Sequence, residues 1–341
     1  MNKFAKRSLE FLAVLLLTFI IELSSPFNPW IKASVMTSVQ TEILDIAHQI
    51  REGFLAYVEV DGHYGPVLYE FFGLGYLPTD GHIVHLIMEF VLIFITVLFL
   101  YKTAKLYTSE IFALVSAAGL SIFAWGALTH AGAEEFMFFI LTLSCYHIAR
   151  QLKSGFLSHH SYLLAIDLGL VFFLQPGYVF FWIALIIFFA IKFKVDGIES
   201  KQYKSFCLST LEGLLTVGVP MGLYLWYFKN ASAFWQQVVV YNMKNLGGFV
   251  EGFKIILTTP WAVCLAILVL IIIIKAISKE KVVDLCCWLG IMIVGFVVIA
   301  LQGDNYISFR ELSKALYIVP IAATFSFIDK ALGLEVEERL F

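Results

Sequence analysis

The chain has 341 residues, of which 60% are hydrophobic, 16% aromatic and only 14% charged, with a formal net charge of -3. Soluble globular proteins carry roughly 25% charged and about 45–50% apolar residues. This composition therefore excludes a soluble cytosolic enzyme, a disulfide scaffold, a disordered regulator and a nucleic-acid-binding protein, which would need a basic face. It indicates an integral membrane protein.

Ten apolar segments approach the roughly 17–25 residues that a transmembrane helix needs. The sequence predicts an all-α polytopic fold with about 10 transmembrane helices (9–11), in one integral membrane domain over residues 1–341 without a soluble C-terminal domain. The first segment follows three basic residues but has no cleavage site, so we expect a retained span. The predicted spans are 8–25, 82–101, 109–129, 134–149, 161–175, 177–192, 206–227, 253–274, 283–301 and 313–330.

The long loop over residues 26–81 holds most of the polar surface between spans. Within it, residues 38–52 place apolar side chains at helical spacing, which predicts an amphipathic helix in the membrane interface, and Gly53 follows as a C-cap. A second stretch, 65–78, is rich in aromatic residues and too short to span, so we expect a helix lying along the membrane. This loop is the predicted location of a site.

Between these two helices, Glu59, Asp61 and His63 fall within five residues, flanked by Tyr57 and Tyr64. In an extended chain, alternate side chains point to one side. Two carboxylates and an imidazole on one side suit general-base catalysis, or binding of a cation that neutralises a phosphate. The alternative is a polar turn that caps the next helix.

Further acids lie at the same predicted membrane face. Glu42 and Asp45 belong to the amphipathic helix, and Glu134 and Glu135 begin the fourth span. Acids in a first turn complement the helix dipole by about 0.3–1 kcal/mol, which is the alternative to a functional role. Because successive helical residues diverge by about 100°, one of the pair should face the bundle.

The segment Gln175-Pro176-Gly177 separates two short spans and predicts a tight turn rather than one kinked helix. Ten spans then place 16 of the 23 Lys and Arg residues on the side of the N-terminus and 7 on the other side. By the positive-inside rule, we expect a multi-pass cell-membrane protein with both termini in the cytoplasm and the loop 26–81 outside. A second outer loop, 228–252, contains Tyr241 and Asn242.

Four segments together resemble the membrane glycosyltransferases of the GT-C superfamily. The run 47–69, with His63-Tyr64-Gly65-Pro66, resembles the first outer loop of the bacterial branch related to protein O-mannosyltransferases and aminoarabinose transferases. Glu134-Glu135 resembles the family's TEE motif, residues 174–177 its LxRPN turn, and Tyr241-Asn242 its later FN loop. The likeness covers roughly the first 250 residues in order.

The resemblance implies transfer of a sugar from a polyprenyl-phosphate carrier to a surface glycan or protein acceptor on the outer face, with membrane lipid as a further partner and no nucleic acid. In such an enzyme an acid of the outer loop acts as the base, and we predict Asp61 or Glu59 for this role, with Glu42 and Asp45 as substitutes and Glu134 or Glu135 assisting. The phosphate needs a cationic group or a divalent cation, and no metal ligands are assigned. The implied substrate-binding residues are Tyr57, His63, Tyr64, Glu42, Asp45, Gln175, Tyr241 and Asn242.

The chain departs from the family pattern at several positions. The family's base Asp falls near Val39 or Gln40, the Arg of the Pro turn is Gln175, and the last outer motif is reduced to Tyr306. A catalytically degenerate subunit that binds lipid-linked sugar or a partner is therefore one alternative. A transporter of lipid-linked glycan is another, which predicts functional roles for the intramembrane acids Glu89, Asp167 and Glu212.

Overall fold

A computed structural model describes residues 3–31, 36–78, 81–258, 260–302 and 310–334, so that Tyr306 lies outside the described residues. Every regular element in these ranges is helical, which confirms the all-α prediction for the described chain. The elements are α1 (Lys3–Glu22), α2 (Ser38–Glu52), α3 (Pro66–Leu74), α4 (Ile83–Ala104), α5 (Glu110–Phe123), α6 (Trp125–Leu128), α7 (Ala133–Ser154), α8 (Ser158–Phe172), η1 (Pro176–Tyr178), α9 (Val179–Val195), α10 (Ser200–Tyr227), α11 (Ala231–Phe234), η2 (Trp235–Val240), α12 (Tyr241–Lys244), α13 (Phe249–Thr258), α14 (Pro260–Ile277), α15 (Val283–Ala300), η4 (Arg310–Tyr317) and α17 (Ile318–Ala331).

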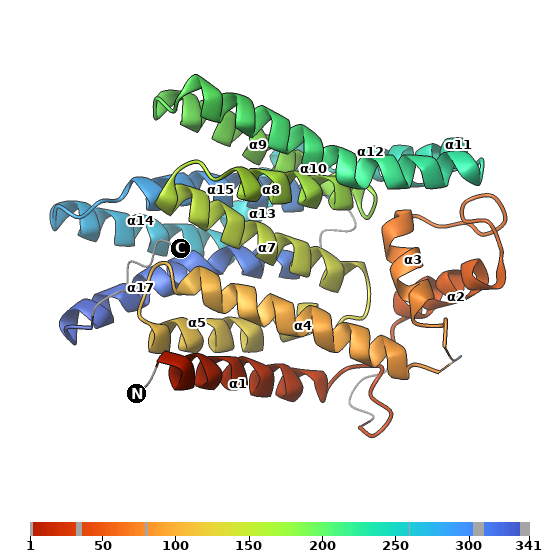
Figure 1. Cartoon of the computed structure of the whole chain (residues 1–341), viewed down its shortest axis with the longest axis horizontal. Helices are drawn as coiled ribbons and strands as arrows, with labels where there is room; N and C mark the ends of the chain where they lie inside the picture. Colours follow the sequence, from red (N-terminus) through yellow and green to blue (C-terminus); the bar gives the residue numbers. More distant parts are fainter. Residues whose placement is uncertain (1–2, 32–35, 79–80, 259, 303–309, 335–341) are drawn as a thin grey trace.

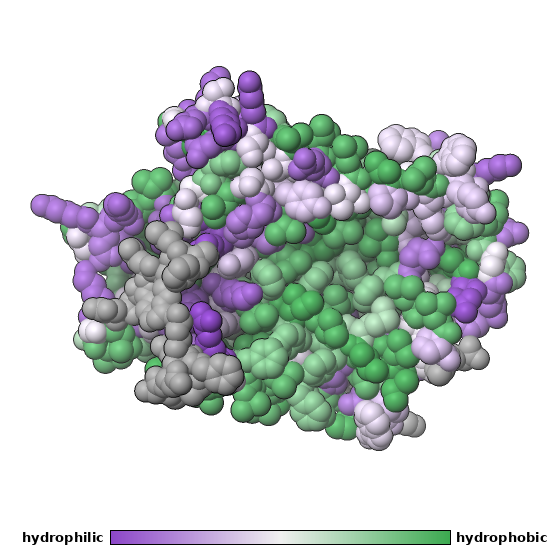
Figure 2. All heavy atoms as spheres, viewed as in Figure 1, coloured by the Kyte–Doolittle hydropathy of each residue, from purple (hydrophilic) through white to green (hydrophobic). Residues whose placement is uncertain are grey.

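The long helices run roughly along one axis (Figure 1). The short helices α2, α3 and α11 gather at one end of this bundle, which we call the loop end, whereas α1 begins and α17 ends at the opposite end. Hydrophobic side chains cover the middle of the visible face, and hydrophilic ones gather toward both ends (Figure 2). This distribution is that of a protein embedded in a membrane.

Six helical segments of the described chain are long and apolar enough to cross a membrane. A helix lies at each of the ten predicted spans, but α5 and α8 are only 14 and 15 residues long, and α7 carries several polar and charged residues. The predicted count of about ten is therefore not confirmed. The six segments are Ile83–Ala104, Pro176–Val195, Ser200–Tyr227, Pro260–Ile277, Val283–Ala300 and Arg310–Ala331.

The bundle is built around α4, α7 and α8. Helix α4 packs against α1, α5 and α7, and α8 packs against α7, α9 and α10. A buried polar chain ties the centre together, because Trp182 Nε1 donates to Ser144 Oγ at 2.8 Å and Ser144 Oγ donates to Asp167 at 2.6 Å. Asp167 therefore has a structural partner, whereas Glu212 is exposed on α10.

The predicted helix over residues 38–52 is confirmed as α2, while its place in the membrane interface stays a prediction. Thr37 and Gln40 form a reciprocal capping box at its start, and Gly53 ends it with φ 106°. Its apolar side, including Ile43 and Ala47, is buried against the protein. The predicted second stretch forms α3, which packs against α2. Helices α2 and α3 thus pack together as one unit at the loop end.

Backbone hydrogen bonds from the start of α3 attach this pair of helices to the bundle. The Gly65 N–H donates to the Leu174 carbonyl at 2.8 Å, and the Val67 N–H donates to the Phe173 carbonyl at 3.2 Å. A Cβ at position 65 would overlap the Phe173 carbonyl oxygen, so glycine is needed for this close approach. The Pro176 turn is confirmed, because α8 ends before it and α9 begins after it.

Candidate functional site

An open groove of about 550 Å³ lies beside α2, and we call it the acidic groove. Glu42 and Asp45, which are three positions apart on α2, line it together with Asp61 from the following loop. The three predicted site residues therefore share one surface. The complete lining is Met36, Ser38, Thr41, Glu42, Asp45, Ile46, Gln49 and Asp61.

Asp61 is held by a side chain far away in the sequence. Gln237 Nε2 donates to Asp61 Oδ1 at 3.0 Å and to the Tyr57 carbonyl at 2.9 Å, while the Gly62 N–H donates to Gln237 Oε1 at 3.2 Å. Gln237 lies in η2, a π-helical segment, and such segments are frequent at functional sites. This clamp orients the Asp61 carboxylate toward the groove.

The chain around Glu59 is a tight turn, which differs from the extended segment considered in the sequence analysis. The Tyr57 N–H donates to the Val60 carbonyl at 2.8 Å, and Tyr57 adopts a φ of 66°, an unusual conformation for an aromatic residue. The Glu59 Oε2 atom accepts the Leu55 N–H at 2.7 Å. Glu59 therefore closes the turn and is not part of the groove lining.

The predicted residues of the second loop meet those of the first. The rings of His63 and Tyr241 stack with centroids 3.9 Å apart and an interplanar angle of 9°. Asn242 Nδ2 donates to the His63 carbonyl at 3.0 Å, and Gln175 Nε2 donates to Asn242 Oδ1 at 2.7 Å. Three segments that are distant in sequence thus form one surface.

Tyr64 connects this surface to the start of α7. Burial, followed by the charges of Glu134 and Glu42, raises the pKa of Tyr64 above its ordinary value, so its phenol stays protonated. The Tyr57 hydroxyl donates to the Tyr64 carbonyl at 2.9 Å. A neutral phenol can donate a hydrogen bond to an anion or to a hydroxyl group.

Glu134 and Glu135 are both buried, with exposed fractions of 3% and 4%, and they have different partners. Glu134 pairs with His130 at 3.0 Å, whereas Glu135 accepts the Ala131 N–H at 3.0 Å. Ala131 adopts a φ of 50°, which is rare for a residue other than glycine. The sequence predicted that one member of the pair faces the bundle, whereas the structure buries both side chains.

Sequence reasoning missed three residues of this region: Gln237, His130 and Gln40. Gln40 accepts the Thr37 N–H at 2.6 Å and also donates to the His130 carbonyl. The Thr-x-x-Gln spacing is a capping-box signature and could have identified Gln40 as structural. No local pattern marks Gln237, because its role depends on a contact across 176 residues.

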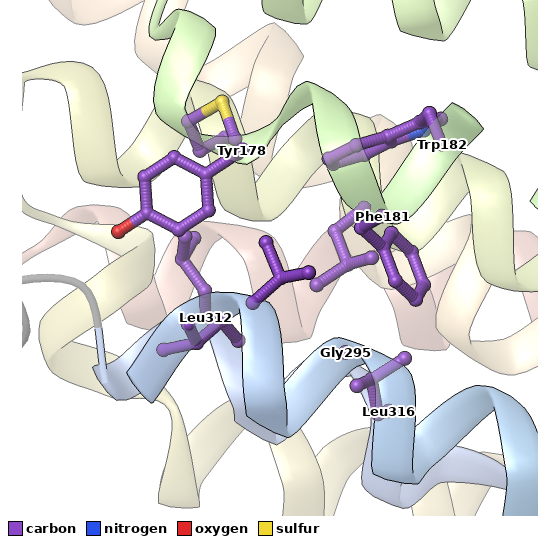
Figure 3. A pocket seen from close by; sticks show the side chains of 10 residues that line it. Tyr178, Phe181, Trp182, Gly295, Leu312 and Leu316 are labelled. Carbon is purple, nitrogen blue, oxygen red and sulfur yellow. The ribbon is translucent and has the colours of Figure 1, made fainter. Parts of the chain in front are cut away.

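A small apolar cavity lies deeper in the bundle, where Tyr178, Phe181 and Trp182 face Leu312 and Leu316 (Figure 3). Its volume is about 10 Å³, which is close to the minimum for a single water molecule. Tyr178 lies near enough to Glu134 and Tyr64 to interact with them electrostatically. The cavity is packed core rather than a substrate pocket.

Within the described residues, no three His, Cys, Asp or Glu side chains are placed to hold a metal ion together. The acidic groove therefore does not fit a divalent cation held by protein ligands alone. Comparisons with family models, with curated proteins and with solved structures find no match for this chain.

Proposed function

We propose that the protein is a membrane glycosyltransferase that takes a sugar from a polyprenyl-phosphate carrier and passes it to a surface glycan or protein. The observation that carries this proposal is the acidic groove, in which Asp61, held by Gln237, shares one surface with Glu42 and Asp45. The resemblance of the four sequence segments to the GT-C superfamily supports it. The proposal includes cytoplasmic termini and a loop end that faces outward.

In the proposed reaction, the acceptor hydroxyl attacks the anomeric carbon of the donor sugar. The bond between that carbon and the phosphate oxygen breaks, and the polyprenyl phosphate leaves with the bonding electrons. Asp61 takes the proton of the acceptor hydroxyl, since it is exposed to the groove and its second oxygen has no described hydrogen-bond partner. Phosphate is a good leaving group, so no acid needs to protonate it.

The remaining residues bind the substrates in this proposal. The exposed His63 ring and the neutral Tyr64 phenol would contact the phosphate, and Glu42 and Asp45 would accept hydrogen bonds from sugar hydroxyls. Tyr241 supports His63 by stacking, and Asn242 and Gln175 hold the His63 backbone. Glu134 acts from behind Tyr64 as a positioning residue.

The test is donor turnover by the purified chain in lipid nanodiscs, supplied with radiolabelled polyprenyl-phosphate mannose or glucose and membrane-derived acceptor glycans. Asp61→Asn should lower the rate by about 10²–10⁴-fold, the usual contribution of a general base. Glu52→Gln, an exposed acid of the same loop, is the matched control and should retain the wild-type rate. If Glu59→Gln abolished turnover and Asp61→Asn did not, the assignment of the base would be wrong.

One observation favours a second candidate, a subunit that binds lipid-linked sugar without catalysis. The family's base position falls near Gln40, whose side chain is occupied by hydrogen bonds to Thr37 and His130. This candidate predicts that wild-type protein retains polyprenyl-phosphate sugar in native mass spectrometry but never consumes it. Turnover that depends on Asp61 would exclude it.

A further inference from the structure

Three buried carboxylates lie on α1, α4 and α7, where α4 packs against the other two helices. Glu22 ends α1, Glu89 lies in α4 and Glu135 lies in the first turn of α7, with exposed fractions of 6%, 3% and 4%. Each is close enough to another for electrostatic interaction. Three negative charges would therefore repel one another in a site without bulk water.

Hydrogen bonds from the protein reach only some of the carboxylate oxygens of this cluster. The Ser25 hydroxyl donates to Glu89, and the Ala131 N–H donates to Glu135 at 3.0 Å. Both oxygens of Glu22 and one oxygen each of Glu89 and Glu135 have no hydrogen-bond partner in the described chain. No Lys, Arg or His of the described residues forms an ion pair with them. An uncompensated buried charge costs several kcal/mol.

An independent side chain is turned toward the same place. His85 is 1% exposed and lines one cavity together with Glu89 and Glu135. Its Nε2 atom lies 2.9 Å from the Phe72 carbonyl and must therefore donate a hydrogen to it. Its Nδ1 atom is buried without a partner. In a neutral imidazole this second nitrogen is an acceptor, so the site contains unpaired acceptors and lacks donors.

The missing donors can be supplied by protons. The cavity between His85, Glu89 and Glu135 has no free volume for an ion, and the described side chains include no set placed to ligate a metal. A proton needs no additional space. We propose that Glu22, Glu89, Glu135 and His85 form a proton-binding site, independent of the function proposed above.

The groups that face this site come from every element packed around it. His82, which directly precedes α4, is exposed and has its ring centroid 5.6 Å from that of His85, and the ring centroid of Tyr76, which follows α3, lies 4.5 Å from that of His85. The residues before α7 contribute His130, which is paired with Glu134. Helix α3 contributes the apolar rings of Phe71 and Phe72.

Infrared difference spectroscopy of the whole protein in nanodiscs tests this site, because a protonated carboxyl group has a C=O stretching band that a carboxylate lacks. At pH 7, where isolated glutamate with a pKa of about 4.3 is ionised, the wild type should retain this band. Glu22→Gln and Glu89→Gln should each reduce it. Glu280→Gln, a control acid paired with Lys275 and Lys330, should leave it unchanged.

Thermal unfolding provides a second measurement that does not depend on the band. Glutamine imitates a protonated glutamate, so both variants should fold, and their melting temperature should fall less than that of the wild type as the pH rises above 7. Absence of the carboxyl band at pH 7 in the wild type would overturn the proposal. Loss of the band on addition of Na⁺ or Ca²⁺ at constant pH would also overturn it, since the site would then bind a metal cation.

Discussion

His63 and Tyr241 lie face to face, with ring centroids 3.9 Å apart, although 178 positions separate them in the chain. The Asn242 side chain, next to Tyr241, also donates to the His63 carbonyl at 3.0 Å. The loop between α2 and α3 is therefore attached to the segment η2–α12 through both a ring contact and a backbone contact. This attachment forms one side of the candidate site.

Removal of the ring at position 241 should loosen this attachment. Aromatic pairs contribute about 0.5–1.5 kcal/mol beyond their buried area, so we expect Tyr241→Ala to increase amide hydrogen exchange around His63. Tyr241→Phe keeps the ring and should behave as the wild type does. Equal exchange in Tyr241→Ala and Tyr241→Phe would contradict a role for stacking.

Gln237 should control the loop that carries Asp61. Gln237→Ala removes three hydrogen bonds, to Asp61, to the Tyr57 carbonyl and from the Gly62 N–H. With about 0.5–1.5 kcal/mol for each bond, the loop should become more sensitive to limited proteolysis and more rapid in hydrogen exchange. Gln236→Ala, at an exposed neighbouring position, is the matched control. A similar effect in both variants would show that the clamp is unimportant.

The ion pair between His130 and Glu134 predicts a pH dependence. Burial lowers the pKa of His130, but the hydrogen bond and the charge of Glu134 outweigh it and raise the pKa above the ordinary value of 6.5. The pair therefore stabilises the folded state fully below pH 6.5, and this contribution is lost as the pH rises through the raised value. In Glu134→Gln only the effect of burial remains, so the pKa of His130 should fall below 6.5.

Histidine ring resonances in a nuclear magnetic resonance titration measure this shift directly, and a His130→Asn spectrum assigns the signal. Glu135→Gln is the control, because Glu135 bonds to the Ala131 N–H rather than to His130. A His130 pKa that is unchanged in Glu134→Gln would contradict the ion pair.

The close approach at Gly65 predicts a steric penalty. Gly65→Ala would push a methyl group into the Phe173 carbonyl, and overpacking of this kind typically costs about 1–3 kcal/mol. We expect a lower melting temperature in detergent solution and weaker docking of α3. Gly119→Ala is the control, because a Cβ there meets no atom within 4 Å. Equal stability of the two variants would show that the loop can move aside.

Several features follow from local sequence, because the forces that produce them act over a few residues. Composition and apolar runs predict the membrane and a helix at each of the ten apolar segments, and the helix over 38–52 with its glycine cap is confirmed. The Pro176 turn is confirmed, but proline alone does not decide such a turn, since α10 continues through Pro220. The number of spans is less certain from sequence, since α5 and α8 prove too short to meet the length expected of a spanning helix.

Only the tertiary structure decides which polar residues act together. Glu59 and Asp61 are two positions apart. Glu59 accepts a hydrogen bond from the Leu55 N–H within its own turn, whereas Gln237 holds Asp61 at the groove. The sequence by itself determined that charge is scarce in this chain and where each acid lies along it. Folding determined which acids become neighbours, because burial and repulsion depend on distances across the bundle rather than on spacing along the chain.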